Sequence, residues 1–111
     1  MRFEWDRDKS RLNLLKHDVR FETAVLVFDD PYALTQRDEA FGEDRWLTIG
    51  AIGPDALLIV VHTFFEIDRE EIIRIISARA AASHERRQYE EAYTGAKARH
   101  RRHRGKKRPK Y

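Results

Sequence analysis

Cysteine is absent from the 111 residues, which excludes disulfide bridges, thiolate zinc sites and a cysteine nucleophile. Glycine is scarce as well: the five glycines are scattered, and they form neither a phosphate-binding loop nor a dinucleotide fingerprint. No apolar run approaches the roughly 18 residues of a membrane-spanning helix, and the first residues carry charges of both signs instead of a secretion signal. We therefore expect a protein of a reducing compartment, with cytoplasmic localisation.

Charged residues, in contrast, make up 37% of the chain, compared with ~25% in an average protein. Their signs are unevenly distributed. Residues 1–94 contain 13 Lys and Arg and all 19 Asp and Glu, a formal net charge of −6, whereas residues 95–111 contain nine Lys and Arg and no acid. The sequence therefore predicts one acidic folded domain over 1–94 and a basic tail over 95–111 that is disordered when free.

The first third of the chain predicts a short strand over 2–5 and two helices. Asp6 is a candidate N-cap for a helix over 7–17, in which Leu12 and Leu15 fall on one apolar stripe, as on the buried side of a helix. A second helix is predicted over 21–28 from apolar residues at i, i+3, i+4 and i+7, and the proline at 31 ends it.

Beyond this proline the apolar period changes towards 2 and predicts strands over 45–52, 56–64 and 71–78, with a further strand over 32–35 able to precede them. The connections are too short for crossover helices, so the strands should form an antiparallel meander. A last helix is predicted from residue 80 to about 93 with Gly95 as its stop, although the following residues could continue it after a kink. The expected fold class is α+β, an antiparallel sheet flanked by two N-terminal helices and a C-terminal helix.

Basic side chains in or beside apolar segments are the candidates for chemistry, because burying an unpaired charge costs several kcal/mol. Two interpretations of Arg74 stay open: a site residue, or a surface cation paired with an acid. In a regular strand it would share a face with Ile72 and Ile76, while Ile73, Ile75 and Ser77 take the other. A lone histidine such as His62 is more often structural than catalytic. The candidates are Lys16, His17, Arg45, His62, Arg74 and Arg79.

A set of this composition fits metal-free cleavage of RNA. Cleavage through the 2′-hydroxyl needs a group that withdraws its proton, cations that stabilise the phosphorane, and a group that protonates the leaving oxygen. Arginines, an imidazole and a lysine supply these functions without a metal or a cofactor. His100 and His103 are spaced closely, but the arginines around them would repel a divalent cation.

The order and spacing of several short motifs between residues 2 and 93 closely resemble the BrnT ribonuclease-toxin family of type II toxin–antitoxin systems. These motifs are Phe3-Glu4-Trp5-Asp6, then Lys9 and Asn13, Lys16-His17-Asp18-Val19-Arg20-Phe21-Glu22-Thr23-Ala24, Asp30-Pro31, Arg45-Trp46-Leu47-Thr48-Ile49-Gly50, Val61-His62-Thr63, Ile73-Arg74-Ile75-Ile76-Ser77-Ala78-Arg79, Glu85-Arg86 and Tyr89.

The resemblance implies a bacterial toxin with a compact RelE-like fold that cleaves RNA to inhibit translation and growth. It also implies neutralisation by a BrnA-type antitoxin, a ribbon-helix-helix DNA-binding protein with which the toxin represses its own operon. A dimer or a hetero-oligomer with the antitoxin is compatible with this. The family's motif positions transfer to the six candidates above, with Arg45, Arg74 and Arg79 on RNA and Glu22 as an acidic partner.

Two segments depart from the family's pattern. The loop after His62 is bulky and acidic over residues 64–70, and the basic tail lies outside the matched region. A competing interpretation is a non-catalytic toxin relic, or an interaction module that binds nucleic acid through its tail; the net charge of residues 1–94 favours it, because an acidic body attracts RNA poorly.

Overall fold

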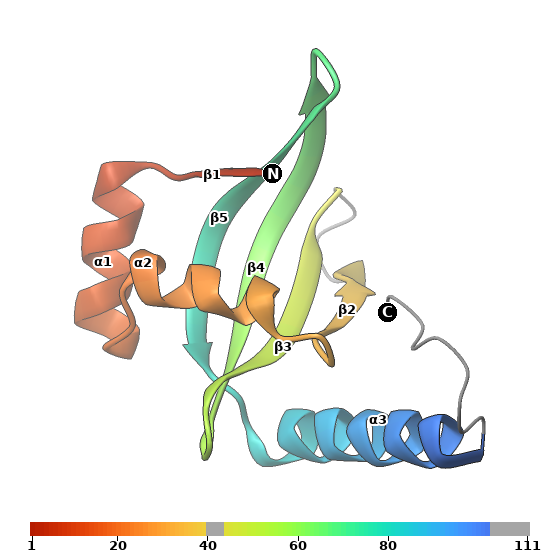
Figure 1. The fold of residues 1–111 in the computed structure, drawn as a ribbon. Helices are drawn as coiled ribbons and strands as arrows, with labels where there is room; N and C mark the ends of the chain where they lie inside the picture. The colour runs from red at the N-terminus through yellow and green to blue at the C-terminus, as the bar shows by residue number, and fades with distance from the viewer. Residues whose placement is uncertain (40–43, 103–111) are drawn as a thin grey trace.

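The described part of the chain folds into a five-stranded sheet with helices on both faces (Figure 1). The structure, a computed structural model, describes residues 1–39 and 44–102, with side chains up to residue 95. The strand order is β1-β5-β4-β3-β2. The elements are β1 (Arg2–Glu4), α1 (Arg7–His17), α2 (Phe21–Ala24), the 3-10 helix η1 (Val25–Asp29), β2 (Leu34–Arg37), β3 (Trp46–Gly53), β4 (Ala56–Ile67), β5 (Glu70–Ala80) and α3 (Ser83–Arg102).

The predicted antiparallel meander is confirmed for β2 to β5, but β1 pairs with β5 in parallel. The expectation of a purely antiparallel sheet is therefore wrong at this edge. Phe3 is aligned with Ile73, and its ring packs at 5.3 Å from that of Phe28. A three-residue alternation predicts a strand but contains no information about its partner or direction.

The first face of the sheet, which carries Val60, Ile73 and Ile75, is covered by α2 and η1, while α1 lies beside β5 at the edge of the sheet. Phe21 and Val27 are fully buried against the first face. The 3-10 helix approaches β3 closely at Gly50, where a Cβ atom would lie 2.7 Å from Cγ1 of Val27. Glycine at this position therefore allows η1 to lie directly on the sheet.

The second face of the sheet is covered only over part of its area in the described residues. Tyr89 of α3 packs on Ile49, Leu57 and Ile59, which are all buried. Further along β4 towards the β4–β5 turn, the side chain of Phe65 on this face is exposed. Both faces are thus partly covered, as the aliphatic runs in β4 and β5 predict.

A polar side chain, Asn13, is the residue through which α1 packs on the sheet. Leu12 and Leu15 are 62% and 80% exposed, so the prediction that they form the buried stripe is wrong. The amide of Asn13 donates to the carbonyl oxygens of Val19 (2.9 Å) and Ala78 (2.8 Å), and its Oδ1 accepts from the N–H of Ala78 (3.0 Å). Asn13 thereby continues the hydrogen bonding of β5 beyond the end of β1.

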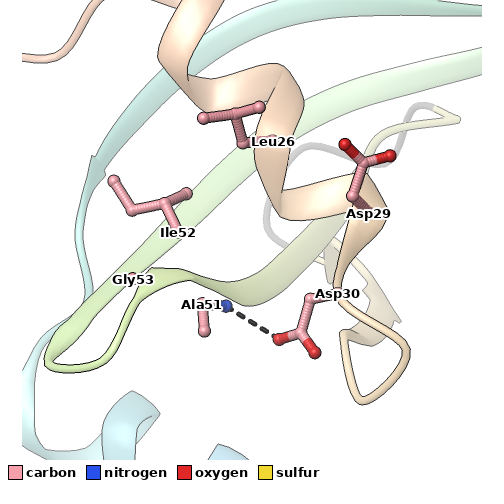
Figure 2. Close-up of a pocket in the computed structure, with 6 residues that line it drawn as sticks. All are labelled: Leu26, Asp29, Asp30, Ala51, Ile52 and Gly53. Atoms are coloured by element: carbon pink, nitrogen blue, oxygen red, sulfur yellow. Dashed lines mark hydrogen bonds between the residues drawn. The ribbon is translucent and has the colours of Figure 1, made fainter.

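At the opposite edge of the sheet, the side chain of Asp30 continues the hydrogen bonding of β3 beyond the end of β2. Its Oδ2 accepts from the N–H of Ala51 at 2.8 Å, in the groove between η1 and β3 (Figure 2). The same oxygen accepts from the hydroxyl of Tyr89 at 2.6 Å, and Oδ1 accepts from the N–H of Tyr32 at 2.9 Å. Burial and the hydrogen bond from its hydroxyl to Asp30 raise the pKa of Tyr89. Asp30 therefore joins η1, β3 and α3.

The C-terminal helix continues past its predicted end near residue 93, and Gly95 lies within it. A glycine inside a helix costs about 1 kcal/mol, and the alanines and long basic residues that follow favour the helix. Residues 97–102, expected to be disordered, are helical, whereas 103–111 lie outside the described residues. None of the helices in the described residues is long and apolar enough to cross a membrane.

Candidate functional site

A bulge in β5 places Arg74 and Arg79 on the same face of the sheet. Arg74 is aligned with Thr63 and Arg79 with Ile59, so four steps along β4 correspond to five along β5. The extra residue is Ile76, between the pairs made by its two neighbours. Without the bulge, side chains five residues apart would point to opposite faces. The same shift moves Ser77 to the second face, which corrects its predicted position beside Ile73 and Ile75.

Arg45, the residue before β3, falls on this face as well when the pairing of β3 with β4 is extended by one residue. Trp46 is aligned with His62, so the register continued by one residue places Arg45 beside Thr63, the partner of Arg74. The N–H of Asp38 donates to the carbonyl oxygen of Arg45 at 2.9 Å and so extends the pairing of β2 with β3 by one step. We call the surface that carries Arg45, Arg74 and Arg79 the arginine face.

Arg74 is paired with an acid but remains accessible. Its Nη1 lies 3.1 Å from Oε1 of Glu4, and the two side chains are 47% and 36% exposed. Such exposed pairs contribute only about 0–1 kcal/mol to stability. An incoming phosphate can therefore replace the carboxylate, and the paired and the phosphate-binding interpretations of Arg74 are compatible.

Arg79 is held more tightly, by a partner that sequence reasoning did not assign. Its Nη1 and Nη2 donate to the two oxygens of Glu85, both at 2.7 Å, and Oε1 of Glu85 also accepts from the N–H of Ala82. The hydrogen bonds from Arg79 lower the pKa of Glu85, and those same bonds raise the pKa of Arg79. The carboxylate of Glu85, in the first turn of α3, therefore binds both Arg79 and the backbone at the start of this helix. In the sequence, the motif Glu85-Arg86 was the signal that could have identified Glu85 as a residue of the site.

His62 is buried in the first face, completely out of contact with solvent. The rings of Phe28 and Phe64 lie 5.0 and 4.8 Å from it, and its Nε2 is 2.7 Å from Oγ1 of Thr48. Nδ1 has no hydrogen-bond partner among the described residues. Burial lowers the pKa of His62 to about 4, so the ring is neutral at physiological pH. This environment is that of a structural histidine.

The stability of the protein should therefore fall between about pH 6.5 and pH 4. In this window the unfolded chain binds a proton at His62 that the folded chain does not, whereas above pH 6.5 neither state binds it. The shift corresponds to about 3 kcal/mol of lost stability at pH 4. Chemical denaturation of the wild type and of His62→Gln, whose amide can keep the contact with Thr48, should show a shallower pH dependence for the variant. Identical slopes would contradict the prediction.

Lys16 and His17 are exposed in the last turn of α1. The hydrogen bonds between Asn13 and Ala78 hold the C-terminal half of α1 beside the end of β5. Ala78 is the residue that precedes Arg79. Glu22 is exposed in α2, over the first face. The six candidates therefore form three groups: the arginine face, the end of α1, and the buried His62.

Comparisons with known proteins agree with this architecture. Residues 5–85 match the family described as ribonuclease toxin, BrnT, of type II toxin–antitoxin systems. The crystal structure of the Brucella abortus ribonuclease toxin BrnT is similar, with 25% sequence identity and a TM-score of 0.56 over 75% of this chain and 99% of that chain. A comparison with curated proteins found no match. The match over most of the chain shows that it belongs to the BrnT ribonuclease toxins of type II toxin–antitoxin systems.

Proposed function

We propose that this protein is a metal-independent endoribonuclease toxin with a RelE-like fold, neutralised by a BrnA-type DNA-binding antitoxin with which it represses its own operon. The observation that carries the enzymatic part is the arginine face. Arg74 and Arg79 point to one side of β5 because of its bulge, and Arg45, the residue before β3, falls on the same side when the pairing of β3 with β4 is extended by one residue. Family membership supplies the antitoxin and the RNA target.

The chemistry requires no metal because arginines supply the positive charge. The 2′-hydroxyl of RNA loses its proton and attacks the adjacent phosphorus; the bond from phosphorus to the 5′-oxygen breaks, and this oxygen takes up a proton. The products carry a 2′,3′-cyclic phosphate and a 5′-hydroxyl. Arg45 and Arg74 hold the non-bridging oxygens, on which negative charge accumulates in the transition state.

The remaining candidate residues serve as proton carriers, as an additional positive charge and as a structural residue. Lys16 and His17 are exposed, and imidazole and ammonium groups are suitable proton carriers. Arg79 keeps one side of its guanidinium on Glu85 and contributes charge at the end of the arginine face. His62 acts indirectly, by filling the first face, because RNA cannot reach it in this conformation.

A non-catalytic relic that binds nucleic acid through its tail is the second candidate function. The net charge of −6 over residues 1–94 favours it, because the folded body repels RNA outside local basic patches. The two functions differ in one observable: the relic binds RNA without cutting it.

The purified toxin, freed from its antitoxin, should cleave RNA in the presence of EDTA and leave 2′,3′-cyclic phosphate ends. Gel analysis of a labelled RNA, with the ends identified by mass spectrometry, measures both. Arg74→Ala, purified in parallel, controls for contaminating nucleases. Activity that is lost in EDTA and restored by Mg²⁺ would disprove metal independence, and binding without any cleavage would favour the relic.

A further inference from the structure

The hairpin formed by β4 and β5 projects beyond the rest of the sheet (Figure 1). The last residue of β4 aligned with β3 is His62, and the first residue of β5 aligned with β1 is Ile72. The outer edge of β4 over residues 64–67 consequently has no strand beside it in the described part of the chain. Asp68 and Arg69, both with positive φ, close the hairpin. We call residues 63–71 the hairpin tip.

The hairpin tip combines apolar side chains with an excess of acids. Phe64, Phe65 and Ile67 are 38%, 38% and 49% exposed. Four acids at the tip outnumber Arg69, its one basic residue, and no lysine or proline protects the edge. An exposed strand edge with apolar side chains can pair with an added strand, and the acids of this edge disfavour an acidic partner. The acids are Glu66, Asp68, Glu70 and Glu71.

We propose that the antitoxin docks on the hairpin tip by adding an extended segment with apolar and basic side chains to the free edge of β4. This inference rests on the proposed function, in which an antitoxin neutralises the toxin. The backbone groups of the edge offer the hydrogen bonds, the exposed rings offer apolar contact, and the acids select a basic partner.

The charges of the other possible occupants argue against them. A second copy of the chain would place two acidic tips against each other, and like charges destabilise such a contact. RNA phosphates are repelled for the same reason. The chain's own tail is basic, but Tyr111 is the single large apolar or aromatic residue in its sequence over 95–111, too few to cover both Phe65 and Ile67.

The position of the hairpin tip also accounts for neutralisation. Phe65 is aligned with Ile72, and Thr63 with Arg74, so Phe65 and Arg74 lie on the same face two residues apart in register. A segment that covers Phe65 therefore lies next to Arg74, at the border of the arginine face. Docking at the hairpin tip would block the approach of RNA to this face.

The double variant Phe65→Ser/Ile67→Ser tests the docking site. Its RNA cleavage without antitoxin should stay within twofold of the wild type, while its affinity for the cognate antitoxin, measured by calorimetry, should fall at least about 100-fold, because few residues dominate such interfaces. Leu12→Ser/Leu15→Ser removes two exposed leucines of α1 and should bind normally. Unchanged affinity of the hairpin variant, or an equal loss in both variants, would overturn the proposal.

Hydrogen exchange gives a second measurement on the wild-type complex. Amides of residues 64–67 should become protected when the antitoxin binds; an exchange pattern that leaves this segment unchanged would place the antitoxin elsewhere. A free toxin that dimerises through the hairpin tip would favour a second copy as the occupant and would also overturn the proposal. Absence of RNA cleavage by the free wild type contradicts the proposed enzymatic function alone, because the exchange experiment locates the docking surface without activity.

Discussion

Arg74→Ala is expected to reduce the rate of RNA cleavage about 100-fold. The substitution removes a cation that stabilises the negative charge developing on the phosphate in the transition state. The free energy of unfolding should change by no more than about 1 kcal/mol, since the lost pair with Glu4 is exposed. Single-turnover cleavage at saturating RNA, combined with urea denaturation, separates the two effects. Arg74→Lys, which keeps the charge but not the fork of donors, should recover part of the rate.

The matched control for this variant is Arg37→Ala. Arg37 is an exposed arginine that pairs with Asp44 at 3.1 Å and lies over the ring of Trp46, away from the arginine face. Its removal should leave cleavage within threefold of the wild type. If Arg74→Ala cuts RNA at the normal rate per folded molecule, Arg74 is structural; if both variants lose activity equally, the effect comes from overall charge.

Asn13→Ala is expected to destabilise the protein by about 3 kcal/mol. It leaves three buried backbone groups without their partner: the carbonyl oxygens of Val19 and Ala78 and the N–H of Ala78. An unsatisfied buried group costs about 1–3 kcal/mol, and water can recover part of this loss at the edge of β5. Chemical denaturation measures the change.

Two further variants of α1 sharpen this test. Leu12→Ala, at an exposed neighbour, should alter the stability by less than about 0.5 kcal/mol. Asn13→Asp keeps an acceptor for the N–H of Ala78 but places a carboxylate against two carbonyl oxygens, so it should be at least as damaging at pH 7 as alanine. A loss below about 1 kcal/mol for Asn13→Ala would show that α1 is held mainly by other contacts.

The strands were predictable from the sequence because alternation and turn residues are local signals. β3 begins one residue after its predicted start, and β4 runs three residues past its predicted end. The packing of α1 was not predictable in this way. Leu12 and Leu15 look like a buried stripe, yet the helix faces the sheet with Asn13, whose partners include a strand 65 residues away. Hydrophobic periodicity cannot identify such an amide.

The candidate site was predictable as a set of residues but not as an arrangement. The motifs identified Arg74 and Arg79, and the parity of a regular strand would have placed them on opposite faces. Their acidic partners, Glu4 and Glu85, come from the neighbouring strand β1 and from α3. Such pairs depend on strand order and on the start of a helix, which a single sequence does not specify.

The bulge at Ile76 has a consequence for how members of this family should be aligned. An odd separation of five residues keeps Arg74 and Arg79 on one side of β5 only because one residue of the strand has no partner. A homologue that lost this residue by deletion would keep both arginines together at an even separation of four. For a homologue without the bulge, an alignment with a one-residue gap between the two basic positions therefore preserves the geometry of the surface. An alignment that keeps the spacing of five residues does not, because it would pair positions on opposite faces of the strand.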